Sequence, residues 1–428
     1  MSELSPDQKG NASLTLGEVV VKTRNNFPDK RFHPKVYLDT PQYHLYGINP
    51  HPYQMWVTAD GIGTKPELAE RLTEATIPAL GERPRDYSAF EGLAFDTFAM
   101  VESDEARWGR FMLGVANIID TNTANPDMIN ALASGALKAC NKGEFALLNG
   151  ETAELGYRVS GYGDSRVNWN AVGVSLINPE KLILGQDLAP GQFIVGLPET
   201  SIRSNGLTKA RQILETAYLT GSGYGSKTQY VLEELYGHFG SEYEETSSDP
   251  LNSLQFLEGL LGHNFLEQVQ LPWHDDYYEI TKELSRPSTL YSPFMYAAQN
   301  GVDGKRDIDI VAAAHISGGG VPEKAKRMVE YKGLGVHIDP VFPDPSAVTM
   351  LMELAQNDLP EEVSNKIIDD KKACEQWNRG LGFLIVVKSK RDVEQLFMLG
   401  QRLNIPAYQV GEVIEEPKIE WRDHTWSY

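Results

Sequence analysis

The sequence predicts a mixed α/β (α+β) protein built from two layered domains. Apolar segments of strand length alternate with segments whose apolar residues recur at helical spacing, which is the pattern of layered α/β architectures. The chain has 428 residues, enough for two or three domains, and 41% of them are hydrophobic, enough for sizeable cores. We expect an N-terminal domain over residues 1–178 and a C-terminal domain over residues 179–428.

In the first half, residues 1–50 are polar and are expected to form an arm with little core of its own. Pro66 suits a first helical position, so a helix is predicted from there to about Ile77. A second helix follows Pro126, because apolar residues up to Cys140 recur at helical spacing. Strands are predicted at 55–59, 145–148 and 171–177, with a polar turn at 149–154.

The second half repeats the order of strand, loop and helix. Residues 221–285 interrupt it with a Gly/Ser-rich start and an acidic run, and are expected to form a surface insertion with its own helices. Strands are predicted at 192–197, 308–316, 381–387 and 407–413, and helices at 207–218 and from Pro322.

The net charge and the cysteine content argue against several classes of function. The 39 Lys and Arg against 59 Asp and Glu give a net charge of −20, which argues against a nucleic-acid partner and means that a phosphate-bearing substrate needs a local cation. Two cysteines are too few for a disulfide framework or a thiolate zinc site. With neither a signal peptide nor an apolar run of membrane length, we expect a soluble cytoplasmic protein without a membrane partner.

The strongest local motif is Asp60-Gly-Ile-Gly-Thr-Lys65, directly after a predicted strand. A carboxylate at a strand end can bind magnesium through its oxygens. Gly61 and Gly63 would let backbone N–H groups of the Gly61–Thr64 segment approach phosphate oxygens, and Lys65 would add a positive charge. The spacing is not that of a Walker A loop, and an Asp-Gly turn with a surface lysine remains the alternative.

A second anion-binding site is predicted at Gly318, Gly319 and Gly320, between an apolar strand and the start of a helix. Free N–H groups and the helix dipole favour a phosphate at such a position. A flexible linker is the alternative. His315 precedes this loop and is either a core histidine or a catalytic one. Asp96 and Asp104, eight residues apart in one predicted helix, are interpreted as sharing a face.

These motifs, taken in order, resemble the signatures of the aminoimidazole ribonucleotide synthetase family, the phosphoribosylformylglycinamidine cyclo-ligases of purine synthesis. The resemblance covers residues 60–387. Besides the two segments above it rests on Asn149-Gly-Glu-Thr-Ala-Glu154, Arg203-Ser-Asn-Gly206 and Asn378-Arg-Gly-Leu-Gly382.

The resemblance implies an ATP- and Mg²⁺-dependent ligase that forms a C–N bond in a small nucleotide substrate, as a homodimer with its ATP cleft at the dimer and the N-terminal sheet helping to form it. Asp60 and Asp104 would bind the metal, and Lys65, Asp104 and His315 would be catalytic. The remaining nucleotide contacts would be Gly61, Gly63, Thr64, Gly150, Glu151, Thr152, Ser204, Asn205, Gly206, Gly318, Gly319 and Gly320.

The chain departs from the family pattern at Arg203, where the family has His, and at Lys324, where it has Asn, and it lacks the family's amino-terminal segment. Two rivals to the cyclo-ligase therefore stay open: another ATP-dependent member of the superfamily with a different substrate, and a non-catalytic paralogue.

Overall fold

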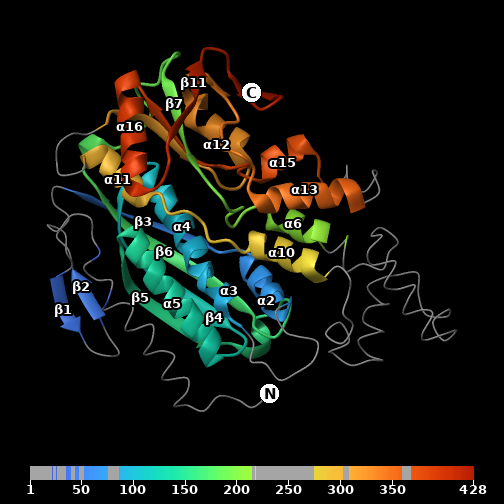
Figure 1. The fold of residues 1–428 in the computed structure, drawn as a ribbon. Coiled ribbons are helices and arrows are strands. Elements are labelled where there is room, and N and C mark those ends of the chain that lie inside the picture. The colour runs from blue at the N-terminus through green and yellow to red at the C-terminus, as the bar shows by residue number, and fades with distance from the viewer. Residues whose placement is uncertain are drawn as a thin grey trace.

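The computed structural model describes residues 22, 26, 35–39, 44–47, 53–75, 86–214, 217, 274–301, 308–358 and 368–428, and all structural statements concern these residues. They form a mixed α/β fold with two main sheets and helices packed on both, as the sequence predicts (Figure 1). Of the predicted amino-terminal arm, the described part contains one antiparallel hairpin of β1 (Lys35–Asp39) and β2 (His44–Gly47).

The N-terminal sheet has four strands in the order β3-β6-β4-β5. The pairs are antiparallel except β4 with β5, which are parallel and joined by helix α5 (Pro126–Gly143). This helix starts where it does because the Asn125 side chain accepts hydrogen bonds from the N–H groups of Asp127 and Met128. The strands are β3 (Gln54–Gly61), β4 (Phe111–Thr121), β5 (Ala146–Glu154) and β6 (Val167–Ile177).

One face of this sheet is covered by α5 and by the mostly buried α4 (Leu93–Ala106), which lie over it in Figure 1. Phe98 of α4 packs edge-to-face on Trp169 and on Phe145, with ring centroids 5.7 and 5.9 Å apart. No helix of the described residues covers the opposite face, on which Met55, Val57 and Ile118 are 53%, 60% and 47% exposed.

The C-terminal sheet has seven strands in the order β13-β12-β9-β11-β7-β10-β8. Its strand β10 (Leu381–Val387) is buried along its whole length, because helices cover both faces. Leu384 faces a core shared with α12 (Gly320–Val329), and Phe383 faces one shared with α11 (Ser292–Asn300) and α16 (Lys390–Leu403). The other strands are β7 (Phe193–Pro198), β8 (Ile310–His315), β9 (Gly335–Ile338), β11 (Tyr408–Ile414), β12 (Lys418–Trp421) and β13 (His424–Ser427).

A separate helical core joins segments distant in the sequence. Leu68, Leu207, Tyr277 and Leu351 belong to one buried cluster, and each comes from a different helix. These helices are α2 (Lys65–Ala75), α6 (Leu207–Leu214), α10 (His274–Leu284) and α13 (Ser346–Asp358). Two short helices, α3 (Ser88–Glu91) and α15 (Asp370–Gln376), complete the elements used below.

Three expectations need correction. The end of the predicted surface insertion is wrong, because Tyr277, Ile280 and Leu284 of α10 are core residues; most of the rest of the 221–285 segment lies outside the described residues. The predicted polar turn at 149–154 is instead the second half of β5, paired with β4 through Glu154. The helix predicted from Pro322 begins two residues earlier, at Gly320.

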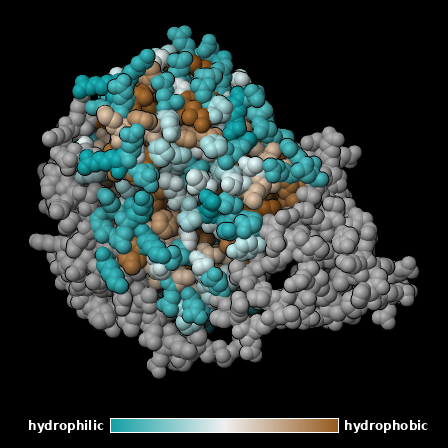
Figure 2. Space-filling model, viewed as in Figure 1, coloured by the Kyte–Doolittle hydropathy of each residue, from teal (hydrophilic) through white to brown (hydrophobic). Residues whose placement is uncertain are grey.

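The surface in Figure 2 is hydrophilic over most of its described part, and its hydrophobic atoms form separate small patches. Among the described residues, no helix combines the length and the apolar character needed to cross a membrane.

Candidate functional site

Two carboxylates lie where β3 ends beside helix α4. Asp60 is the last but one residue of β3, and its Oδ1 accepts a hydrogen bond of 2.7 Å from the N–H of Gly61. Burial by neighbouring atoms and the nearby charge of Asp104 raise the pKa of Asp60. Two neighbouring carboxylates repel each other, and a divalent cation bound by both removes this repulsion.

Asp104 is held by a histidine at the end of a strand of the C-terminal sheet. Its Oδ1 lies 3.1 Å from Nδ1 of His315 and 3.5 Å from Nε of Arg107. Although burial acts in the opposite direction, the hydrogen bond and charge of His315 and the charge of Arg107 lower the pKa of Asp104, so it is ionised at neutral pH. The contact spans 211 positions and connects α4 with the end of β8.

His315 is buried and neutral. Burial first, and the charge of Arg203 second, lower its pKa to about 4. Because an ionised carboxylate only accepts, we assign the ring proton to Nδ1, donated to Asp104, which leaves a lone pair on Nε2. Nε2 is buried and has no hydrogen-bond partner among the described residues. This position suits a residue that orients Asp104 rather than one open to solvent.

Three of the predicted loops converge beside this pair. A Cβ atom at Gly63 would lie 3.8 Å from the carbonyl oxygen of Ser204, and one at Gly318 would lie 3.2 Å from Oδ1 of Asn205. The side chain of Asn205 also approaches α4, with Nδ2 4.0 Å from Sδ of Met100. Segments 61–64, 204–206 and 317–320 therefore meet at the level of α4.

A helix begins at each of these loops: α2 at Lys65, α6 at Leu207 and α12 at Gly320. Not every predicted N–H is available, since Gly61 donates to Asp60 and Gly320 donates to the Ser317 carbonyl at 3.1 Å. In the described structure the N–H groups of Gly63, Thr64, Gly318 and Gly319 donate to no other residue. Free N–H groups at two helix starts form a site where phosphate oxygens are favoured.

Lys65 is not brought to this site in the conformation described. Its ammonium is fully buried and lies 2.7 Å from Oδ1 of Asp96 and 2.7 Å from the Arg286 carbonyl. Asp96 also accepts from the hydroxyl and the N–H of Ser288. Asp96 and Asp104 thus have different surroundings although they share a helix: the first is in an internal ion pair, and the second is at the site.

The β5 motif also lies apart. Asp60, Ala171, Asn117 and Gly150 form one row across the sheet, so Gly150 is three strands from Asp60, or roughly 14 Å at the usual strand spacing. Glu151 pairs with Ile118 on the uncovered face, opposite to the helices, because neighbouring residues of a strand alternate between faces. Thr152 points to the helix side, and its hydroxyl is buried without a partner among the described residues.

Two basic residues that the motifs did not assign accompany the carboxylates. Arg107 follows Asp104 by one turn of α4, and Lys324 of α12 lies near enough to lower the pKa of both Asp60 and Asp104. Burial and the charges of neighbouring arginines lower the pKa of Lys324 itself. The i+3 spacing of Arg107 was visible in the sequence, whereas Lys324 was visible only as a departure from the family pattern.

Arg203, the other departure, is a structural residue in this fold. Its guanidinium is buried, 2.8 Å from Oε2 of Glu199, and also donates to the Ala99 carbonyl and to the hydroxyl of Ser103 on α4. It adopts a left-handed φ of 58° directly before the 204–206 loop. Arg203 thereby attaches this loop to α4, one turn from Asp104.

The carboxylate pair fits a hard divalent cation. One oxygen of each carboxylate is engaged, by Gly61 in Asp60 and by His315 in Asp104. The other oxygen of each accepts no hydrogen bond from the described residues, so both can be ligands. Oxygen donors with positions left for water and phosphate are what Mg²⁺ prefers.

Part of the chain matches a known protein family, and most of it aligns with curated enzymes. Residues 258–424 match the AIR synthase related protein, C-terminal domain. The phosphoribosylformylglycinamidine cyclo-ligase of Staphylococcus epidermidis is 25% identical over 358 residues, covering 83% of this chain and 79% of the relative. The enzyme of that name from Staphylococcus saprophyticus is 26% identical over the same share of both chains.

Among solved structures, thiamine-monophosphate kinase from Stenotrophomonas maltophilia aligns over 90% of both chains with a TM-score of 0.48 and 13% identity. The E. coli hydrogenase maturation protein HypE aligns over 96% of this chain and 95% of its own, also with a TM-score of 0.48 and 13% identity. In the domain match over residues 258–424 and in the curated relatives, the chain is similar to the AIR synthase related proteins.

Proposed function

We propose that this protein is an ATP-dependent cyclo-ligase that closes the imidazole ring of formylglycinamidine ribonucleotide, the reaction named in its curated relatives. The observation that supports this most strongly is the meeting of two helix N-termini and three Gly-containing loops at the Asp60–Asp104 pair. A site of this kind combines phosphate-binding N–H groups with carboxylates for a metal, which is what a nucleoside triphosphate requires.

Asp60 and Asp104 would hold Mg²⁺, with His315 keeping Asp104 ionised and oriented. When bound, the metal supplies charge neutralisation between the carboxylates and the ATP phosphates. The free N–H groups of Gly63 and Thr64, and of Gly318 and Gly319, would bind phosphate oxygens at the starts of α2 and α12. Lys324 and Arg107 would add positive charge at the same place.

In the proposed reaction, the formyl oxygen of the substrate attacks the γ-phosphorus of ATP and ADP leaves. An amidine nitrogen then attacks the activated carbon, which closes the ring, and the phosphate leaves as the nitrogen loses its proton to solvent. The protein's part is positioning and charge stabilisation, since the chain would hold both the phosphates and the substrate in line. No side chain needs to form a covalent intermediate.

The β5 motif is best explained by a homodimer. Glu151 lies on the uncovered apolar face of the N-terminal sheet, away from the Asp60 site of its own chain. Packing two such faces together would bury Val57 and Ile118 and could bring β5 of one copy toward the nucleotide of the other. A dimer would therefore give Glu151 the role that the single chain does not.

A second candidate is a different ATP-dependent reaction within the same superfamily, and a specific observation favours it. Lys324, at a position where the cyclo-ligases have Asn, lies beside both carboxylates, while Lys65 is held by Asp96. A changed pattern of charges at the phosphates is compatible with a different acceptor. A non-catalytic paralogue would bind ATP without turnover.

Turnover measurements separate the three. We would measure ADP release with ATP and Mg²⁺, with and without formylglycinamidine ribonucleotide, and expect release only with the substrate, matched by ring-closed product. Asp104→Asn should lower the rate at least about 100-fold, because it removes charge where phosphate is transferred. The exposed Asp339→Asn should not, since that side chain is 65% exposed in a pair with His337. Release with another carbonyl substrate supports the second candidate, and binding without release supports the paralogue.

A further inference from the structure

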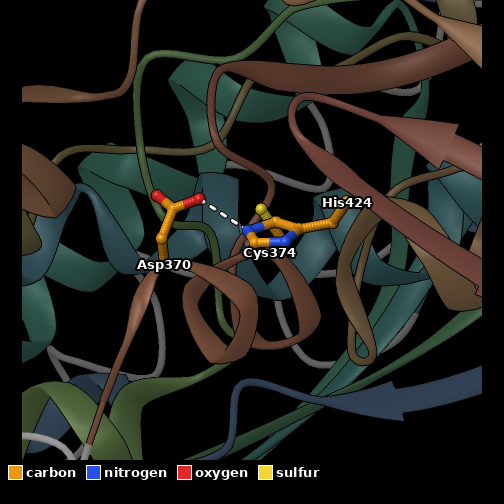
Figure 3. Close-up of side chains that lie close together, drawn as sticks. All are labelled: Asp370, Cys374 and His424. Carbon is orange, nitrogen blue, oxygen red and sulfur yellow. Dashed lines mark hydrogen bonds and ion pairs between the residues drawn. The ribbon is translucent and has the colours of Figure 1, made fainter.

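A cluster of three metal-ligating side chains lies outside the nucleotide site, where the C-terminal hairpin packs on α15. Asp370 and Cys374 occupy one face of α15, one turn apart, and His424 opens strand β13 (Figure 3). One ligand atom from each residue lies within 4.8 Å of the others. Nε2 of His424 is 2.9 Å from Oδ2 of Asp370.

We propose that Asp370, Cys374 and His424 form a transition-metal site, of the class that binds Zn²⁺. Sulfur and imidazole nitrogen select such ions over magnesium, and three protein ligands leave a fourth position for water. The sequence alone indicated neither a thiolate zinc site nor a His/Cys cluster, because it contains only two cysteines. A mixed set needs one cysteine, and its members are separated by up to 54 positions, so spacing does not reveal it.

The charges around the cluster are compatible with a cation. Two guanidinium groups lie near it. Arg379 donates to Asp370 Oδ1 at 2.9 Å and lies 3.6 Å from the sulfur of Cys374. Arg422 donates to Asp344, which also accepts from Arg379. Asp344 neutralises them, accepting two hydrogen bonds from Arg379 and one from Arg422. With Asp370 these charges balance, and Cys374 is a neutral thiol, so the cluster carries no excess positive charge that would repel a metal ion.

The same surroundings argue against a reactive cysteine. Cys374 is buried, and burial raises the pKa of its thiol to about 11. A thiol of this kind is protonated and inert when the site is empty. Metal binding would replace the thiol proton, which leaves to solvent, by a sulfur–metal bond.

The position of the cluster suggests its purpose. The backbone of Cys374 lies against Gly320, where an added Cβ would be 2.0 Å from the Cys374 carbonyl oxygen. Trp377, just after α15, donates from its indole nitrogen to the Gly206 carbonyl at 3.2 Å. Helix α15 thus supports both the 204–206 and the 317–320 loops. A metal bound by residues of both β13 and α15 would fix the position of α15, and α15 in turn contacts the loops of the proposed nucleotide site.

Titration of the chelator-treated full-length protein with Zn²⁺, and separately with Co²⁺, tests the site. We expect one ion per chain and, with Co²⁺, a sulfur-to-metal charge-transfer absorption. Cys374→Ser should abolish that absorption and lower Zn²⁺ affinity more than about tenfold. Losing only a residue that hydrogen-bonds to a metal ligand already costs about tenfold in affinity, so losing the ligand itself should cost more. His424→Gln, at a side chain 25% exposed, should lower affinity similarly while keeping the absorption.

Matched controls are available in the chain. Cys140→Ser changes the other buried cysteine, and His337→Gln changes a histidine that also pairs with a carboxylate, Glu420. Both should bind the metal like the wild type, and so should Asp60→Asn, which separates this site from the nucleotide site. Circular dichroism verifies the fold of each variant. Absence of stoichiometric binding, or absorption that persists in Cys374→Ser, would overturn the proposal.

Discussion

At the scale of single residues, burial decides what the charged side chains of the motifs can do. Lys65 stands at the position where a phosphate-binding lysine was predicted, yet it and Asp96 are both 0% exposed and bonded to each other. Removing one member of a buried pair leaves an uncompensated charge, which is expensive. The lysine therefore contributes to stability in the conformation described.

Lys65→Ala should lower the free energy of unfolding by about 3–5 kcal/mol, because Asp96 would be left buried without its counter-charge. Chemical denaturation measures this. The control is Lys138→Ala, whose partner Glu91 is also an acidic residue but whose side chain is 57% exposed, so the expected loss is at most about 1 kcal/mol. Equal losses would mean that the Lys65 ammonium is not part of the core and is free for a ligand.

The sequence predicted the polar residues of the site better than their contacts. The segments 61–64 and 318–320 follow apolar strands and precede helices, so their place at the site could be read locally. The contact of Asp104 with His315 could not, since it depends on how α4 meets β8 of the C-terminal sheet. Lys65 was misleading because nothing near it in the sequence indicates that Asp96 and Ser288 surround it.

At the scale of elements, strands and helices with a continuous apolar pattern were predicted most accurately. β10 has the predicted bounds, Leu381–Val387, because all of its residues are buried and the pattern is unbroken. β5 was predicted four residues long, since its second half, from Asn149 to Glu154, is polar and lies at the sheet edge with exposed positions. Helix α10 was assigned to an insertion because of the acidic, glycine-rich chain before it.

Helix α10 supplies a prediction of its own. Leu284 is 0% exposed in the helical core with α2 and α13, so Leu284→Ala should lower the free energy of unfolding by about 2–5 kcal/mol. Glu279→Ala on the same helix changes a side chain that is 48% exposed and should lie within about 0.5 kcal/mol of wild type. Thermal melting of both variants tests this prediction. A Leu284→Ala protein as stable as Glu279→Ala would show that α10 lies at the surface and not in the core.

At the scale of the whole molecule, the face of the N-terminal sheet that no described helix covers carries exposed apolar side chains. Met55, Val57 and Ile118 lie on it, at 53%, 60% and 47% exposure. An exposed apolar sheet face of this kind either binds a partner or promotes aggregation. Burial against a second copy of the chain would provide the partner and prevent the aggregation. The division into two domains stays a prediction, and this face depends on strand register, which could not be predicted from the sequence.

We predict that the protein is a dimer through this face, with a mass twice the 47.6 kDa of one chain in light scattering. Val57→Asp combined with Ile118→Asp should give the single-chain mass, because two buried charges cannot be compensated in an apolar interface. Met398→Asp, on α16 at 59% exposure, is the control and should remain a dimer. A wild-type mass of 47.6 kDa at micromolar concentration contradicts the prediction.

The central claim is that Asp60 and Asp104 bind ATP through a magnesium ion, in a chain whose net charge is already −20. Titration calorimetry of ATP into wild type and Asp60→Asn, each with Mg²⁺ and with chelator, tests it directly. The substitution keeps the shape of the side chain and removes its charge. We predict tight binding only for wild type with Mg²⁺, at least about tenfold weaker binding in the other three titrations, and no change for Asp339→Asn. Equal affinities in all four titrations would contradict the metal site and the mechanism proposed from it.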